Sequence, residues 1–252
     1  MYKILAKTLF LGKELIYMPS CHSTNDIALQ ILKKPDTREG VVIITDDQTA
    51  GRGQRGNGWV SAPQSNLTLS VVLKPTFLQA ADQFFLNIIV SLAVRKMISA
   101  YTEESDVKVK WPNDVLLNQK KVAGILIENT LQRSSIQWSV IGMGVNINQQ
   151  NLDLSKATSL FKETRNTHEL PILFEQLIIL LENYYLKLKS GKKEELKSEY
   201  LQHLFGFQQF RKYRTEYLFD GKIIDVDQTG RLILETVKGE KSFDFKEIEF
   251  IY

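Results

Sequence analysis

Cysteine, histidine and charge of one dominant sign are all scarce in this chain of 252 residues. The single cysteine, Cys21, excludes an internal disulfide and a cysteine-rich zinc site within one chain. The three histidines lie at positions 22, 168 and 203 without metal-ligand spacing, so the sequence predicts no metal site. A net charge of +3 is too weak to indicate nucleic-acid or membrane binding by itself.

Long apolar runs are missing as well. The most apolar stretch, Phe84–Val94, is far shorter than the roughly 20 residues needed to cross a bilayer. Lysines and a glutamate interrupt the apolar residues near the start of the chain, and no small-residue cleavage site follows. Secretion and membrane insertion are therefore disfavoured. Together with the single cysteine, this composition leads us to expect a cytoplasmic protein.

Hydrophobic periodicity predicts strands in pairs with helices interspersed. Strands are expected at 14–18, 41–45 and 66–73, and then in three segments that read VKVKW, GILIE and IQWSVIGMGVNI. Helices are expected from residue 25 up to Pro35, and at 80–101, 171–189 and 192–204. This order predicts an α+β fold with a mixed or antiparallel sheet.

The pattern changes from Phe210 onward. Short alternating runs follow one another there, separated by DG, TG and KG turns. This pattern predicts that the C-terminal segment forms a separate small β-barrel or sheet. We therefore expect two domains, with residues 1–205 forming the larger one and residues 206–252 the smaller one.

A glycine-punctuated loop, GRGQRGNGW, spans Gly51–Trp59 and carries Arg52 and Arg55. Glycine lets backbone N–H groups approach an anion, and arginine offers forked donors, so the loop suits a mobile cover over a phosphate or carboxylate. A plain surface turn explains the same pattern. The chain has no GxxxxGK[ST] motif, and the loop does not open a helix, so Walker-type and dinucleotide-fold sites are both excluded.

A second segment, KWPND, begins at Lys110 and ends in Asn113 and Asp114, which suit a turn. Taken alone, it reads as a hairpin with solvated lysines. Lys121, however, comes just before a strand predicted to be buried, where a lysine is held close to the core and can meet an anion as a point charge.

Other polar positions remain open to two interpretations. The STN sequence at 23–25 is either a helix cap or a set of ligand contacts. Gly142, Gly144 and Asn146 either let a ligand approach the end of a strand or form a tight β-bend. Trp59 is either a packing residue or the wall of a pocket beside the loop.

The order and spacing of these motifs resemble the biotin–protein ligase family. The shared motifs are STN, Q-TAGRGQRG-x-x-W, NL-x-x-S, KWPND, K-x-AGILIE and GxGVNIN, between about Tyr17 and Asn148. The resemblance implies a mixed β-sheet backed by helices, like that of class II aminoacyl-tRNA synthetases, followed by a small SH3-like β-barrel. At two loop positions this chain departs from members that read GRGRRGRxW, because Gln54 and Asn57 replace arginines.

The resemblance also implies an activity. The biotin carboxylate attacks the α-phosphate of ATP, with Mg²⁺ carried mainly by the phosphates, and biotinoyl-5'-AMP then biotinylates a lysine of a biotin carboxyl carrier domain. It implies no DNA partner, because the chain begins almost directly with the expected catalytic domain, and it leaves a homodimer open. The rival hypotheses are a lipoate–protein ligase and a non-catalytic module that binds a nucleotide or a partner.

The resemblance carries roles onto individual residues of this chain. The expected catalytic residues are Lys121, Arg52 and Asp114. The expected biotin-binding residues are Ser23, Thr24, Asn25, Gln48, Arg52, Gly53, Gln54, Lys121 and Gly124. The expected ATP-binding residues are Arg52, Arg55, Trp59, Lys110, Asn113, Lys121 and Asn146.

Overall fold

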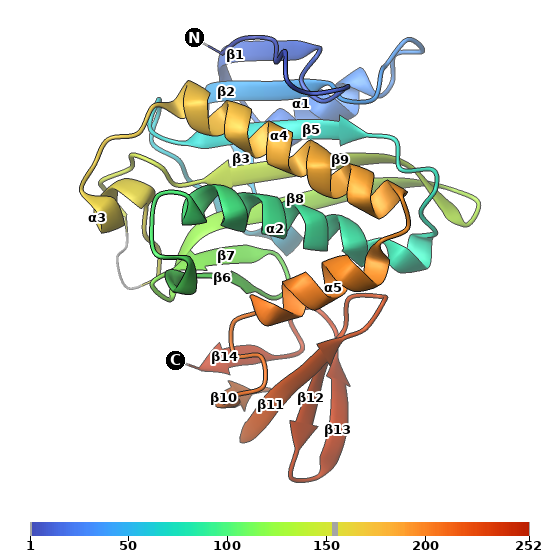
Figure 1. Cartoon of the computed structure of the whole chain (residues 1–252), viewed down its shortest axis with the longest axis vertical. Helices are drawn as coiled ribbons and strands as arrows, with labels where there is room; N and C mark the ends of the chain where they lie inside the picture. The colour runs from blue at the N-terminus through green and yellow to red at the C-terminus, as the bar shows by residue number, and fades with distance from the viewer. Residues whose placement is uncertain (1, 153–155, 252) are drawn as a thin grey trace.

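The computed structural model of the chain describes residues 2–152 and 156–251, apart from the side chain of Arg55. It consists of a large sheet crossed by helices and a smaller sheet near the C-terminus, which Figure 1 shows at opposite ends of the long axis. This architecture confirms the predicted mixed sheet backed by helices with a small C-terminal β module. Within the described residues, no helix is both long and apolar enough to cross a membrane.

The large sheet has seven strands in the order β1-β2-β5-β9-β8-β7-β6. Strands β1 and β2 run parallel, and every other neighbouring pair is antiparallel. The strands, in sheet order, are β1 (Leu15–Cys21), β2 (Val42–Gln48), β5 (Leu67–Leu73), β9 (Ser135–Val145), β8 (Lys120–Gln132), β7 (Asp114–Leu117) and β6 (Val107–Lys110).

The pleat of the central strands divides the core into two layers. In β2, Val42 and Ile44 belong to the larger apolar cluster, whereas Ile43 between them belongs to the smaller one on the opposite face. Helices α2 and α4 cover the first face, and α1 covers the second. The helices are α1 (Thr24–Ile31), α2 (Phe84–Ser99), α3 (Leu160–Thr164), α4 (Leu170–Lys189) and α5 (Lys193–Gln202), with short 3₁₀ turns η1 (Gln54–Gly56), η2 (Ala80–Asp82) and η3 (Glu104–Asp106).

The smaller sheet, named here the C-terminal module, spans residues 210–251 and has five antiparallel strands in the order β13-β12-β11-β10-β14. Its strands are β10 (Phe210–Arg214), β11 (Leu218–Val226), β12 (Leu232–Thr236), β13 (Gly239–Phe243) and β14 (Glu249–Ile251). The predicted domain boundary between residues 205 and 206 stays a prediction.

Two predicted helices differ from the structure. The helix expected at 80–101 is divided, because Ala80–Asp82 forms the separate 3₁₀ turn η2 and α2 runs only from Phe84 to Ser99. The backbone N–H of Ala80 donates to Ser134 O at 2.7 Å in the β8–β9 hairpin. The first helix ends at Ile31, four residues before Pro35. Pro35 has no N–H to donate to the Ile31 carbonyl, which accepts instead from Lys34 N at 2.9 Å and from the Thr37 hydroxyl at 2.6 Å, so this end agrees with the predicted role of the proline.

The segment from Val107 to Val145 holds four strands, not the three that were predicted. The missed strand is β7, and Asp114 is its first residue and lies outside the turn. The glycine-punctuated loop is more ordered than predicted: Gly51–Arg52 (β3) and Gly58–Trp59 (β4) pair as a short hairpin around η1. It does lie between β2 and β5, as expected.

Candidate active site

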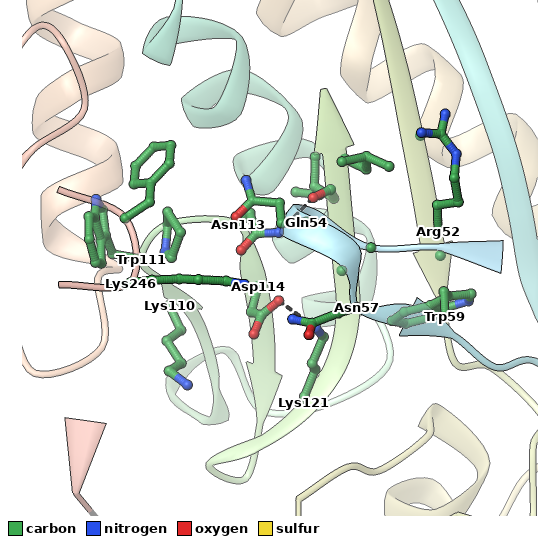
Figure 2. A pocket seen from close by; sticks show the side chains of 18 of the residues that line it. Arg52, Gln54, Asn57, Trp59, Lys110, Trp111, Asn113, Asp114, Lys121 and Lys246 are labelled. Carbon is green, nitrogen blue, oxygen red and sulfur yellow. Dashed lines mark hydrogen bonds and ion pairs between the residues drawn. The ribbon is translucent and has the colours of Figure 1, made fainter. Parts of the chain in front are cut away.

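One cavity of about 1390 Å³ lies between the β3–β4 hairpin, the exposed ends of β7, β8 and β9, and the C-terminal module. It brings together most of the predicted site residues, several of which Figure 2 shows pointing toward one another. The predicted residues that line it are Ser23, Thr24, Asn25, Gln48, Arg52, Gly53, Gln54, Trp59, Lys110, Asn113, Asp114, Lys121 and Gly124.

Lys121 and Asp114 form an ion pair at the centre of this cavity. The distance from Lys121 Nζ to Asp114 Oδ1 is 2.7 Å, and the two side chains are 35% and 18% exposed. A register shift between Val115 and Leu116 interrupts the β7–β8 ladder beside them. Such bulges re-aim side chains. The ammonium therefore sits at a fixed point inside the cavity and not on a freely moving surface chain.

The turn before β7 is fastened to β8 through Asn113. Asn113 Nδ2 donates to Ile125 O at 2.7 Å, and the backbone of Ile125 donates to Asn113 O at 2.9 Å. This pair of bonds holds the KWPND turn against strand β8, which together with β9 forms the floor of the cavity. The Asn113 amide nitrogen thus has a structural partner in addition to any ligand.

The STN segment forms a buried polar wall at one end of the cavity. Residues 23–25 are 2–3% exposed, and Ser23 stands at the N-cap of α1 yet makes no capping hydrogen bond through its side chain. Gln48 Oε1 accepts from the backbone of Thr24 at 2.9 Å, and Ser70 Oγ donates to Asn25 Oδ1 at 2.6 Å. The helix-cap interpretation does not account for this arrangement.

Arg52 joins the hairpin to this polar wall. Its Nη2 lies 2.7 Å from Asp26 Oδ1 and 2.9 Å from Glu128 Oε2. Asn25 Nδ2 donates to the same Glu128 carboxylate at 2.8 Å. Figure 2 shows the Arg52 side chain turned away from Lys121, so the guanidinium closes the cavity at the STN end.

The indole of Trp59 lies on a strip of glycine in the floor. A Cβ at Gly144 would lie 2.3 Å from the Trp59 ring, and one at Gly124 would lie 3.0 Å from it. A Cβ at Gly142 would similarly lie 2.4 Å from Asn25 Oδ1. Gly142 and Gly144 pair in regular register within β9, so the interpretation as a tight β-bend is wrong. These glycines make room for side chains that face the cavity.

One predicted residue, Asn146, is not brought to the cavity, and for another, Arg55, the side chain is not described. Asn146 is 4% exposed, does not line the cavity, and donates through Nδ2 to Thr158 O at 3.1 Å. Its contact with a nucleotide stays a prediction that this position does not support. The side chain of Arg55 lies outside the described part of the chain.

Other residues at the site were given no role from the sequence. The acidic partners of Arg52 are Asp26, which directly follows STN, and Glu128, the last residue of the K-x-AGILIE motif. The C-terminal module adds Arg214, Lys246 and Phe250, which lie about a hundred residues or more beyond KWPND in the chain. Only the folded arrangement of the module against the large sheet brings them to this place.

Comparisons with known proteins agree with the geometry. Residues 17–146 match the family model of the Biotin/lipoate A/B protein ligase family. The Bifunctional ligase/repressor BirA of Bacillus spizizenii is 30% identical over 250 residues, covering 96% of this chain and 76% of that protein. A Biotin–[acetyl-CoA-carboxylase] ligase of Paracoccus denitrificans is 38% identical over 128 residues, or 50% of this chain and 51% of that protein.

The fold has solved counterparts as well. The biotin protein ligase from Aquifex aeolicus, in complex with biotin and ATP, superposes with a TM-score of 0.78 at 25% identity and covers 95% of this chain and 99% of that chain. A Leishmania major biotin protein ligase in complex with biotinyl-5-AMP gives a TM-score of 0.63 at 20% identity, covers 92% of this chain and 98% of that chain, and supports the fold alone.

Proposed function

The chain belongs to the biotin/lipoate A/B protein ligase family, and from this premise we propose that it is an ATP-dependent biotin–protein ligase. It activates biotin as biotinoyl-5'-AMP and transfers the biotinoyl group to a lysine of a biotin carboxyl carrier domain. The observation that carries the proposal is the single cavity in which the Lys121–Asp114 pair, the STN wall and the Arg52 hairpin meet.

Lys121 is proposed as the central cation of the first step. The carboxylate of biotin and the triphosphate of ATP repel each other, so a fixed ammonium between them both positions the reactants and stabilises charge in the transition state. The carboxylate is already ionised at neutral pH, so this step needs no general base. The half-buried position of Lys121 beside Asp114 supports this role.

The polar wall is proposed to hold the ring system of biotin. The buried residues Ser23, Thr24 and Asn25 and the half-buried Gln48 offer donors and acceptors of the kind that fix a small polar ring. In this assignment the hairpin residues Arg52, Gly53 and Gln54 cover the intermediate, and Gly124 leaves room in the floor.

The nucleotide is proposed to extend from Lys121 toward Lys110 and Asn113, with Trp59 flanking the adenine. Arg55 remains a proposed nucleotide contact, whereas the bond of Asn146 to Thr158 O does not favour the contact expected for that residue. Mg²⁺ bound with ATP would supply positive charge to the phosphates, and Asp114 is the carboxylate beside Lys121 that would help to hold it.

In the second step the lysine amine of the carrier must lose a proton before it attacks the mixed anhydride. Asp114 is proposed to assist this loss, since its carboxylate lies in the cavity next to the reacting centre. The hairpin excludes water from the reactive anhydride while the carrier approaches.

The decisive test incubates the protein with MgATP, a carrier domain and either biotin or lipoate, followed by mass measurement of the carrier. We expect one biotin on a single lysine and no lipoate. Exclusive lipoylation supports the lipoate ligase instead. Absence of pyrophosphate exchange with either acid supports a non-catalytic binding module.

A further inference from the structure

The backbone of Lys121 is held by a later segment of the chain, which lies beyond all the recognised motifs. Strand β9 pairs with β8 only from Ala123 onward, and residues 156–158 run parallel beside Lys121 in its place. The N–H of Lys121 donates to Lys156 O at 3.0 Å, and its carbonyl accepts from Thr158 N at 2.9 Å. Segment 156–158 therefore serves as the neighbouring strand at the lysine proposed as the central cation.

Glu163 on α3 holds this segment and the turn before β8 at the same time. Its Oε1 accepts from the Thr158 hydroxyl at 2.5 Å, and its Oε2 accepts from Asn118 Nδ2 at 2.6 Å. Asn118 and Gln119 form the two-residue turn between β7 and β8, with φ of +49° and +64°. One carboxylate thus joins the turn that leads into Lys121 to the segment that flanks it. Hydrogen bonds to an ionised carboxylate are stronger than those between neutral groups.

Thr158 is the buried link in this arrangement. It is 1% exposed, and its N–H, carbonyl and hydroxyl are bonded to Lys121 O, Asn146 Nδ2 and Glu163 Oε1. A buried polar group that loses its partner keeps its full desolvation cost. The segment is therefore held in one position beside Lys121.

Neither Glu163 nor Thr158 lines the cavity, whereas Lys121 does. Their bonds reach the cavity only through the backbone of that lysine. A charged group displaced by about 1 Å can lose about a hundredfold in rate. Residues behind the floor can therefore change the chemistry without touching a substrate.

We propose that Glu163, acting through the Thr158 hydroxyl and the Asn118 turn, is a positioning residue that fixes the Lys121 ammonium for adenylate formation. The inference rests on the role of Lys121 in the proposed function. Without this support the ammonium stays in the cavity beside Asp114, so the substrates still bind. The charge that develops in the transition state is stabilised less, because the ammonium is no longer held at one point.

The test removes the Thr158 hydroxyl while keeping a branched side chain of similar size. Thr158→Val takes one donor from the Glu163 carboxylate, and Thr158→Ser restores it. We expect Thr158→Val to lower the kcat of pyrophosphate exchange about tenfold with an unchanged KM for biotin, and Thr158→Ser to recover most of the rate. The matched control, Thr164→Val, removes an α3 hydroxyl that bonds Leu160 O and not Glu163, and it should match the wild type.

A double-mutant cycle separates positioning from plain destabilisation. Lys121→Ala leaves no ammonium to position, so adding Thr158→Val should cause no further loss of pyrophosphate exchange. All rates are measured on protein that circular dichroism shows to be folded. An equal loss with and without Lys121 would overturn the proposal, as would an unchanged kcat in Thr158→Val.

Amide hydrogen exchange by NMR tests the same assignment without activity. We expect the Lys121 amide, which donates to Lys156 O, to exchange several-fold faster in Thr158→Val than in the wild type or Thr164→Val. An unchanged amide would mean that Glu163 does not hold Lys121. A wild-type protein that exchanges no pyrophosphate would overturn the proposed function instead, and the amide measurement would then decide alone whether Glu163 positions this lysine.

Discussion

At the scale of single residues, substitution of Lys121 should affect the chemical step much more than the binding of biotin. We expect Lys121→Ala to reduce pyrophosphate exchange at saturating biotin by about two to three orders of magnitude, because it removes charge stabilisation at the reacting centre. Biotin binding measured by calorimetry should weaken far less. The polar wall that is proposed to hold biotin is left intact.

The matched control is Lys120→Ala. Side chains alternate along a strand, and Lys120 precedes Lys121 on β8 without lining the cavity. Near-normal exchange in Lys121→Ala, or an equal loss in Lys120→Ala, would contradict the role proposed for Lys121.

The glycine under Trp59 gives a second prediction at this scale. A methyl group at Gly144 would stand 2.3–2.6 Å from atoms of the indole, so Gly144→Ala must displace the ring. We expect a longer-wavelength tryptophan emission and a fall in exchange rate of about ten- to a hundredfold from misplacement of the site. Gly58→Ala, on the same hairpin, meets only the carbonyl of Gly51 at 3.9 Å and should behave like the wild type. Unshifted emission in Gly144→Ala would refute the displacement.

Sequence motifs predicted most of the residues that line the cavity, but not the direction in which each side chain points. Asn113 and Lys121 do line one cavity, as the spacing of KWPND and K-x-AGILIE indicated. Asn146 shares a motif with Gly144 yet points behind the floor, toward Thr158. A motif records a position on a strand, whereas the direction of a side chain depends on pairing with segments far away in the chain.

At the scale of elements, Arg52 is one anchor of the β3–β4 hairpin, and the Trp59 indole on Gly144 is another. The guanidinium forms ion pairs with Asp26 on α1 and Glu128 on β8. Arg52→Gly should therefore free the hairpin, release biotinoyl-AMP several-fold faster and biotinylate bystander lysines without selection. The effect is modest per contact because half-exposed ion pairs are weak.

Release is measured by chasing pre-formed intermediate, and selectivity by mass spectrometry of an added non-carrier protein. Arg38→Gly removes an exposed arginine away from the cavity and serves as control. If Arg52→Gly retains the intermediate as long as the wild type does, the hairpin is not held by this residue.

Elements with a strong period were predicted best. Helix α2 is buried almost all round, as its nearly continuous apolar sequence indicated. Its start was wrong because residues 80–82 form a separate 3₁₀ turn, which local periodicity does not distinguish from the first turn of an α-helix. Strand β7 was missed because DVLL is only 4 residues long and follows residues that suit a turn.

At the scale of the whole molecule, one of the contacts between the C-terminal module and the larger domain joins a turn of the module to two buried aromatic residues. The indole nitrogen of Trp111 donates to Gly230 O at 2.8 Å, and a Cβ at Gly230 would lie 2.6 Å from the ring of Phe84. The sequence predicted the module but not this contact, since nothing in the local pattern pairs position 230 with positions 84 and 111. The contact also sets where the module meets the cavity.

Two glycines of the module allow this contact to be tested cleanly. Gly230 and Gly239 have nearly the same backbone, with φ of +96° and +97°, but a Cβ at Gly239 meets nothing within 4 Å. Gly239→Ala therefore measures the left-handed strain alone, about 1–2 kcal/mol in urea unfolding. Gly230→Ala adds overpacking against Phe84 and should cost about 1–3 kcal/mol more. Because the shift also moves the module relative to KWPND, pyrophosphate exchange should fall in Gly230→Ala only. Equal destabilisation of the two variants would mean that the module docks elsewhere.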